Sequence, residues 1–209
     1  MDSDVDVDVD VDVDVVTTYV ALLGAVNVGG RKVPMAQLRE VMAELGYEDV
    51  RTYLASGNVV FAATAVSSGN WDEDAVGRWI GEALEERFGF EVPCLVRDGD
   101  YLRSVVSACP FPADELEGRQ LHVTFYSRPG LPERFAEIDQ AGFAPEAFGV
   151  WDQVLYLYAP DGVGRSPLAA ALAKVDRRAK DVFGTSRNWN TVKALVEMMP
   201  AEVGAPGES

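Results

Sequence analysis

The sequence predicts an α+β fold made of two tandem βαββαβ units that pack as one body, followed by a C-terminal helix. Short apolar runs typical of strands alternate with helical periodicity in the order β-α-β-β-α-β, and the second half of the chain repeats that order with different residues. The order is that of the ferredoxin-like split βαβ unit. The 209 residues are 48% hydrophobic, which suffices for a sizeable core in one or two domains.

The first half begins with the apolar run Thr18–Val26, which predicts a buried strand. Pro34 then starts a helix that ends at Gly46, because Pro is favoured at the first helical position and Gly after the last. Between them, apolar residues recur at spacings of three and four, as in a helix with one buried face. These residues are Met35, Leu38, Val41, Met42 and Leu45.

The rest of the first half predicts two strands, a helix and a further strand. The strands Val50–Leu54 and Asn58–Ala62 are joined around Ser56 and Gly57. Residues 71–89 predict a helix with acidic residues at its positive N-terminal end, and residues 90–97 predict the next strand. The acidic residues are Asp72, Glu73 and Asp74, and the expected buried face consists of Val76, Trp79, Ile80, Ala83, Leu84 and Phe88.

The second half predicts the same order of elements after a helical connection over residues 98–112. The predicted elements are a strand at 121–127, a short helix at 131–142, a hairpin at 146–160 that turns at 151–153, a helix at 166–184, a short strand at 184–188 and the terminal helix at 190–199. Only the order of the elements, and no residue identity, relates the two halves.

These elements divide the chain into a first ferredoxin-like unit at 17–97, a helical linker at 98–119 and a second unit with the terminal helix at 120–200. Residues 1–16 carry an Asp-Val repeat. Strict alternation has the period of a strand, but Asp is a poor strand former and a row of like charges repels itself. We therefore expect a disordered low-complexity segment rather than a tail that binds cations or a basic partner, and a flexible tail at 201–209.

The chain is strongly acidic, with 34 Asp and Glu against 18 Lys and Arg and a formal net charge of -16. This charge disfavours nucleic-acid and membrane-surface partners, which both attract cations. No apolar run approaches the ~20 residues that span a bilayer, and the N-terminus lacks the features of a signal peptide. Cys94 and Cys109 are expected as free thiols rather than as a disulfide. We therefore expect a cytoplasmic protein.

Two stretches of the sequence are long and specific enough to suggest a family. Residues 19–61 resemble the opening of the bacterial domain-of-unknown-function family 1697, and residues 185–195 resemble its closing block. The resemblance spans roughly Thr18 to Met199 and implies a tandem α+β fold of ferredoxin-like character, with no established activity, substrate or cofactor. The chain departs from the family at Gly24, where members usually carry the arginine of an Arg-Gly-Ile/Val-Asn block. Any ligand contact made by that arginine is therefore missing here.

The loop NVGGRK, at residues 27–32, places glycines and cations between a predicted strand and a predicted helix. It is not a P-loop, because no hydroxyl follows its lysine, and it lacks the spacing and the parallel βαβ unit of a dinucleotide site. Glycines still let backbone N–H groups approach a ligand, and a helix N-terminus favours negative charge. The candidates for such an anion site are Asn27, Gly29, Gly30, Arg31 and Lys32. The alternative is a tight turn with two solvated cations.

Two further polar clusters could complete this site. Ser56 and Asn58 flank a turn, and the segment SRNWN offers a planar cation, amides and a stacking surface in Arg187, Asn188, Trp189 and Asn190. Structural roles are the alternative: Ser56 and Asn58 bonding nearby backbone, Asn190 or Thr191 capping the last helix, Trp189 filling the core and Arg187 pairing with an acid. A shared ligand site requires that these segments meet in space.

Signals for catalysis are weak. The single histidine, His122, lies in a predicted strand, where a structural imidazole is the favoured interpretation. Cys94 lies in an apolar strand with no cation nearer than Arg97, which argues against an activated thiolate. No cluster suggests a metal site, and no motif identifies a cofactor or an oligomeric state.

The leading hypothesis is a binding or interaction module for a small molecule or an anionic ligand, without established catalysis. One alternative is an enzyme that acts on a small phosphorylated or nucleotide-like substrate, with Arg187 and Lys32 acting electrostatically. Another is nucleic-acid binding, because ferredoxin-like sheets can stack bases on aromatic side chains, although the acidic charge opposes it.

Overall fold

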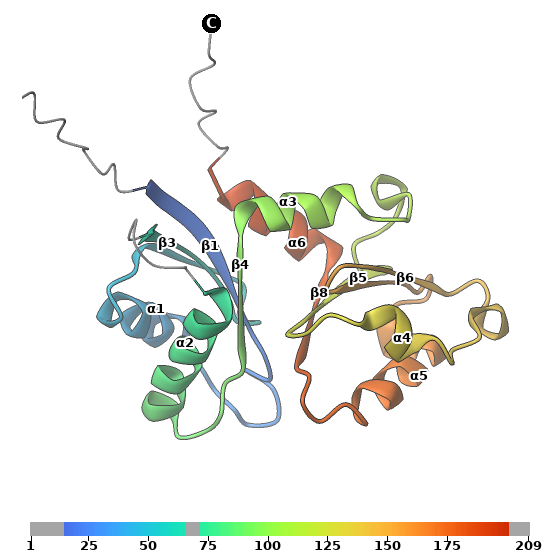
Figure 1. Cartoon of the computed structure of the whole chain (residues 1–209), viewed down its shortest axis with the longest axis horizontal. Coiled ribbons are helices and arrows are strands. Elements are labelled where there is room, and N and C mark those ends of the chain that lie inside the picture. The colour runs from blue at the N-terminus through green and yellow to red at the C-terminus, as the bar shows by residue number, and fades with distance from the viewer. Residues whose placement is uncertain (1–14, 66–71, 201–209) are drawn as a thin grey trace, which may run out of the picture.

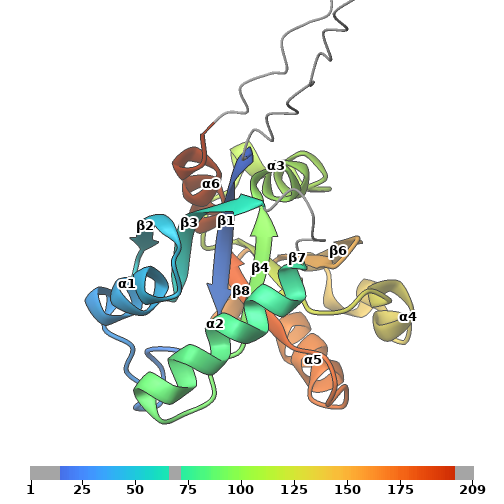
Figure 2. The same ribbon diagram turned by 60° about the vertical axis from the view of Figure 1, so that its left-hand side comes forward.

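The computed structural model describes residues 15–65 and 72–200. The elements of the first half are β1 (Val15–Leu23), α1 (Met35–Glu44), β2 (Glu48–Tyr53), β3 (Asn58–Ala65), α2 (Glu73–Phe88) and β4 (Cys94–Asp98). Its strands form a four-stranded antiparallel sheet in the order β2-β3-β1-β4. Helices α1 and α2 cover one face of this sheet (Figure 1; Figure 2).

The second half follows the connecting helix α3 (Gly99–Ser107). Its elements are β5 (Leu121–Tyr126), α4 (Leu131–Phe135), β6 (Ala147–Trp151), β7 (Val154–Tyr158), α5 (Pro167–Asp176), β8 (Gly184–Asn188) and α6 (Trp189–Met198). The strands form a second four-stranded antiparallel sheet in the order β6-β7-β5-β8. Short 3-10 turns occupy Ala113–Glu115, Gln140–Phe143 and Val163–Arg165.

A shared hydrophobic core joins the two halves. Val20 and Leu22 of β1 pack in one cluster with Phe125 of β5, Leu102 of α3 and Trp189 of α6. The alternate residues of β1 point to a second cluster under α1 and α2, so the strand is apolar from Tyr19 to Leu23, where both of its faces are buried. A third cluster lies between the second sheet and α4 and α5. The shared core lies between the sheets, near α3 and α6 (Figure 1).

The structure confirms an α+β fold with two four-stranded antiparallel sheets and a C-terminal helix. Helix α1 buries Leu38, Val41 and Met42, as the apolar spacing predicted. Helix α2 begins where the acidic residues suggested, because the Asp72 side chain accepts a hydrogen bond from the Asp74 N–H at 3.0 Å. Both cysteines are unpaired, as expected.

One residue of the expected buried face of α2 is exposed. Trp79 is 62% exposed, whereas Val76, Gly77, Ile80 and Leu84 are buried. The helix is rotated so that Gly77 faces β4, where an added Cβ would lie 2.6 Å from the Cys94 carbonyl oxygen. The absence of side chains at this contact lets the helix approach the strand, which moves Trp79 to the solvent side. The prediction for Trp79 was therefore wrong.

Two predicted helices of the second half are shorter than expected. The helix expected at 131–142 ends at Phe135, and a separate 3-10 turn follows, in which the Asp139 side chain accepts a hydrogen bond from the Ala141 N–H. The helix expected at 166–184 ends at Asp176, whose side chain accepts a hydrogen bond from the Tyr126 hydroxyl at 2.9 Å. The chain after Asp176 turns back to begin β8, and apolar spacing does not reveal such a reversal.

Parts of the predicted organisation fall outside the described residues. Residues 1–14 of the expected N-terminal segment lie there, while Val15 and Val16 begin β1. The expected tail at 201–209 also lies outside the described part of the chain. Within the described part, none of the helices has both the length and the apolar content needed to cross a bilayer.

Candidate ligand site at the junction of the two halves

Arg187 is buried at the junction of the two halves, where it is bonded to the main chain. Its side chain lies on β8 and the residue is 5% exposed. Nη2 donates to the carbonyl oxygens of Leu23 at 2.8 Å and Gly57 at 3.2 Å, both in the first half. Nη1 donates to Thr185 Oγ1 and to the Ser186 carbonyl oxygen, and Nε donates to Asn58 Oδ1. These bonds use all five guanidinium N–H groups.

Burial lowers the pKa of Arg187 to about 10, so the guanidinium is still charged at neutral pH. Its partners are carbonyl, hydroxyl and amide oxygens, and the expected pairing with an acid is absent from its hydrogen bonds. The side chain therefore acts as a cross-link between the halves and presents no N–H to a ligand.

Asn58 and Ser56 belong to the same network. Asn58 is 0% exposed, and its Nδ2 donates to the Tyr53 carbonyl oxygen and to Ser56 Oγ, each at 2.9 Å, while its Oδ1 accepts from Arg187. Asn27 is linked to the adjacent turn, because its Nδ2 donates to the Ala55 carbonyl oxygen. The segments around residues 27, 56–58 and 187 thus meet, as a shared site requires. They meet through hydrogen bonds to one another, which stabilise the fold.

The glycine loop is a tight turn with exposed cations. Gly29 and Gly30 have φ of 57° and 87°, conformations that favour glycine, and the Arg31 N–H donates to the Val28 carbonyl oxygen at 3.1 Å. Arg31 and Lys32 are both exposed. The guanidinium carbon of Arg31 lies 5.6 Å from the centre of the Phe90 ring. The loop lies at the end of the first sheet away from α3 and α6 (Figure 1; Figure 2).

The remaining three residues of the predicted site lie at the start of α6. Asn188 caps this helix, with Oδ1 accepting from the Thr191 N–H at 2.8 Å. Trp189 is buried in the shared core. Asn190 is exposed, and its side chain covers Gly118, where an added Cβ would lie 2.3 Å from the Asn190 amide carbon. Successive residues of β8 point to opposite faces, so Asn188 points away from the face that carries Arg187.

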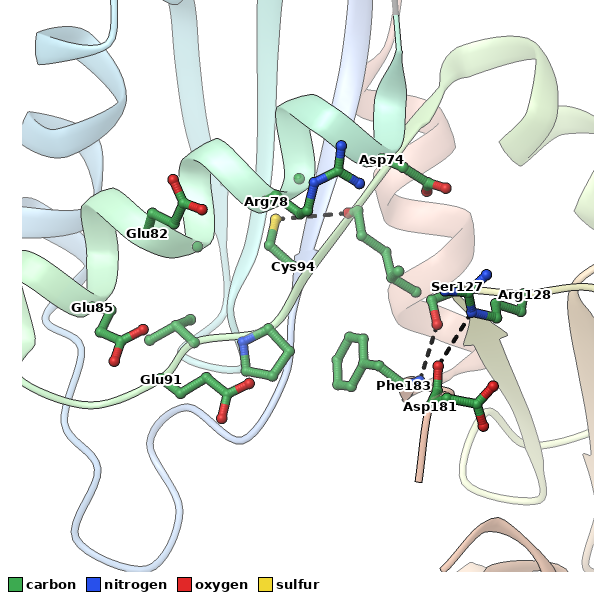
Figure 3. A pocket seen from close by; sticks show the side chains of 15 residues that line it. Asp74, Arg78, Glu82, Glu85, Glu91, Cys94, Ser127, Arg128, Asp181 and Phe183 are labelled. Atoms are coloured by element: carbon green, nitrogen blue, oxygen red, sulfur yellow. Dashed lines mark hydrogen bonds between the residues drawn. The ribbon is translucent and has the colours of Figure 1, made fainter. Parts of the chain in front are cut away.

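A ligand-sized space lies elsewhere at the junction. We name it the junction cleft; its volume is about 470 Å³ and it is bordered by α2 and the start of β4 on one side and by the segments around residues 127 and 182 on the other (Figure 3). The lining residues are Asp74, Gly77, Arg78, Gly81, Glu82, Glu85, Glu91, Val92, Pro93, Cys94, Leu95, Ser127, Arg128, Asp181 and Phe183. This volume falls within the range of small-molecule sites.

Charge is unevenly distributed in the junction cleft. Glu82, Glu85 and Glu91 gather at one end, whereas Arg78 lies nearer to Asp74, and Arg128 lies on the opposite wall beside Asp181 (Figure 3). Arg78 is 3.9 Å from the Asp72 carboxylate, and Arg128 donates Nε–H to the Asp181 carbonyl oxygen at 3.3 Å. Within the described part of the chain, neither Arg128 nor the three glutamates form an ion pair.

Contacts between the halves shape the floor of the junction cleft. An added Cβ on Gly24 would lie 2.3 Å from the Phe183 ring, so the glycine leaves room for that ring. The main chain of Phe183 is fixed by Ser127, whose Oγ accepts the Phe183 N–H at 3.0 Å. Cys94 also borders the cleft, and burial raises the pKa of its thiol to about 12. The thiol is therefore protonated at neutral pH and a poor nucleophile.

A second hollow of about 550 Å³ meets the junction cleft at Asp74 and surrounds Arg97. Arg97 is 4% exposed and donates to the carbonyl oxygens of Val96 and Tyr126 and to Gln153 Oε1. Its Nη1 lies 3.5 Å from Glu73 Oε2. Burial raises the pKa of Glu73, and the charge of Arg97 opposes this rise. The hydrogen bonds of Arg97 reach both halves, so Arg97 is a second cross-link between them.

Sequence reasoning missed the junction cleft. Arg78, Glu82 and Glu85 have the spacing of one side of a helix, but charged residues at this spacing are common on any exposed helix. Arg128 and Phe183 lie in loops that carry no motif. A usable signal was Gly24. The family resemblance implies an arginine at this position, and a glycine in its place indicates that another group occupies the space.

The fold and the cleft define an α+β protein of two antiparallel-sheet halves that share a core and border a ligand-sized space. The sequence profile of the family described as "Protein of unknown function (DUF1697)" matches residues 16–156, more than half of the chain, and the chain belongs to this family. The conserved bacterial protein SP0830 from Streptococcus pneumoniae has a similar fold, with a TM-score of 0.66 and 20% identity over 88% of this chain and 98% of that chain. No curated protein matches the sequence.

Proposed function

We propose that the protein is a binding module for a small molecule and that the ligand binds in the junction cleft. The observation that carries this proposal is a space of about 470 Å³ whose walls come from both halves and carry charges of both signs that form no ion pair among the described residues. Charged groups that form no ion pair at a concave junction are available to a ligand that brings complementary charges. The anionic group that the sequence led us to expect would meet Arg78 and Arg128 rather than the glycine loop.

The chemistry of the cleft favours binding over catalysis. Its thiol, on Cys94, is protonated at neutral pH because burial raises its pKa to about 12. Its hydroxyl, on Ser127, accepts the Phe183 N–H at 3.0 Å and has no neighbouring histidine, since His122 is not among the lining residues. An enzyme that works by electrostatics alone stays the alternative.

Two further proposals concern organisation and location. We propose that residues 17–97 and 120–200 each form a ferredoxin-like unit, joined by the linker 98–119. The support is that each sheet is antiparallel and places its first strand between its third and fourth. We also propose a cytoplasmic location, supported by two unpaired cysteines.

The function is tested by thermal unfolding of the purified full-length chain against a library of amino acids, short peptides, nucleotides and sugar phosphates. At least one class is expected to raise the Tm, because a ligand that binds only the folded state stabilises it. Isothermal titration calorimetry then gives the affinity for each hit.

The matched variants Glu82→Trp and Glu86→Trp test whether a compound that raises the Tm binds in the junction cleft. Both positions are exposed on α2, but Glu82 lines the junction cleft whereas Glu86 lines the groove between α1 and α2. Glu82→Trp is expected to abolish binding by filling the cleft, and Glu86→Trp to leave it unchanged. Equal loss in both variants, or no Tm change with any compound, would refute the proposal.

A further inference from the structure

The positions of the charges in the junction cleft restrict the shape of its ligand. Arg78, Glu82 and Glu85 lie on one side of α2 and are separated by four and three residues. With a rise of about 1.5 Å per residue, Arg78 lies about 6 Å from Glu82 and about 10 Å from Glu85 along the helix axis. Glu91 lies at the glutamate end, and Arg128 faces the other end from the opposite wall (Figure 3).

Each end favours a different charged group. At the glutamate end, three carboxylates line the cleft without an ion pair to any residue that the structure describes, and an ammonium group has three N–H donors for such oxygens. At the other end, Arg128 carries a guanidinium without an ion pair in the described part of the chain, and a carboxylate is its preferred bidentate partner. Two carboxylates, those of Asp74 and Asp181, line this end together with the two guanidinium groups, so the lining here carries no net charge, while the other end carries three negative charges.

The separation of the two ends matches a short peptide. An extended chain advances about 3.3–3.6 Å per residue, so the termini of two or three residues lie about 7–11 Å apart. A single α-amino acid is too short, because its two charged groups are attached to the same carbon. Between the ends, the cleft is bordered by Val92, Pro93 and the Phe183 ring, which offer apolar contact to a side chain.

We propose that the ligand of the junction cleft is a di- or tripeptide with free termini, its ammonium near Glu82 and Glu85 and its carboxylate near Arg78 and Arg128. This inference rests on the proposed binding function and names the ligand class. A sugar phosphate or a nucleotide suits the site less well, because it brings no ammonium group to the three glutamates at the other end of the cleft.

The probe is the dipeptide alanyl-leucine, compared by calorimetry with its N-acetyl form, its C-terminal amide and free leucine. Each loss of a terminal charge is expected to weaken binding about three- to tenfold, the effect of losing one exposed charge-assisted contact. Free leucine is expected to bind at least as weakly as the blocked dipeptides.

Variants then assign each terminus to its end of the cleft. Glu85→Gln is expected to weaken the binding of the free dipeptide but not that of the N-acetyl form. Arg78→Gln is expected to weaken the binding of the free dipeptide but not that of the amide. The matched control is Glu86→Gln, which removes the same charge from the neighbouring residue outside the cleft and is expected to change neither.

The outcomes separate this inference from the proposed function. If the blocked and free dipeptides bind equally, or if Glu85→Gln weakens both forms to the same extent, the peptide assignment is wrong. In that case, another compound of the library whose binding is abolished by Glu82→Trp would still support the proposed binding function. If no compound of any class binds, both the peptide ligand and the proposed function are refuted.

Discussion

Replacing Arg187 with Met tests whether this residue holds the halves together or serves a ligand. The substitution removes five hydrogen bonds, although the carbonyl oxygens of Leu23 and Gly57 each keep one other donor, the Thr185 hydroxyl and the Leu23 N–H. Charged hydrogen bonds contribute more than the ~1 kcal/mol of neutral ones, but Met keeps much of the volume and avoids burying a charge. We expect a loss of about 3–5 kcal/mol in the free energy of unfolding.

Urea unfolding followed by circular dichroism measures this loss. With a slope of about 2 kcal/mol per molar urea, the midpoint should fall by about 2 M. Arg31→Met is the control, because Arg31 is exposed and its ring contact to Phe90 contributes less than about 1 kcal/mol.

A double-mutant cycle with Asn58→Ala isolates the contact between the two side chains. Since Arg187 Nε donates to Asn58 Oδ1 in a buried site, the coupling should be about 1–3 kcal/mol. If Arg187→Met costs less than about 1 kcal/mol and abolishes ligand binding instead, the structural assignment of Arg187 is refuted.

Three further predictions follow from individual residues. Gly77→Ala should destabilise the protein by roughly 1–3 kcal/mol in urea unfolding despite the higher helix propensity of Ala, because its Cβ would lie 2.6 Å from the Cys94 carbonyl oxygen. Gly142→Ala is the control and should be nearly neutral, because nothing lies within 4 Å of its added Cβ. Equal effects of the two substitutions would contradict the close packing of α2 on β4. Burial lowers the pKa of His122, the single histidine, so its contribution to stability is complete above the unfolded pKa of 6.5 and is lost as pH falls through the folded pKa. Between pH 7.5 and pH 5, the free energy of unfolding should therefore fall less in His122→Gln than in the unsubstituted protein. Parallel curves of this free energy against pH would contradict the prediction. Iodoacetamide at pH 8 should label Cys94 in urea but not in the folded protein, because a pKa of about 12 leaves roughly one thiol in ten thousand as thiolate. Mass spectrometry measures the labelling. Rapid labelling of the folded protein would show that the thiol is not shielded.

Much of the fold could be predicted because its signals are local. The spacing of Leu38, Val41 and Met42 predicts the buried face of α1 whatever lies opposite it, and the acidic residues at 72–74 mark the start of α2 through the unpaired N–H groups there. The error at Trp79 arose where a local pattern was ambiguous. Its position on the helix suits either side, and the contact of Gly77 with β4 decided between them.

The candidate site was harder to predict, because the same residue types serve folds and ligands. Arg187, Asn58 and Asn27 are polar residues next to strands or turns, which is typical of both roles. Only their partners distinguish the roles, and those partners include main-chain oxygens whose positions no side-chain pattern encodes.

The sequence by itself determined the order of strands and helices, the α+β class and the family, since hydrophobic period, capping residues and turn glycines act over a few positions. The tertiary structure alone decided that Arg187 closes on Leu23, that Phe183 fills the space above Gly24 and that Arg128 faces α2 across the junction cleft. These contacts join residues far apart in the chain. They depend on how the two sheets pack through their shared core, a geometry that local patterns do not contain.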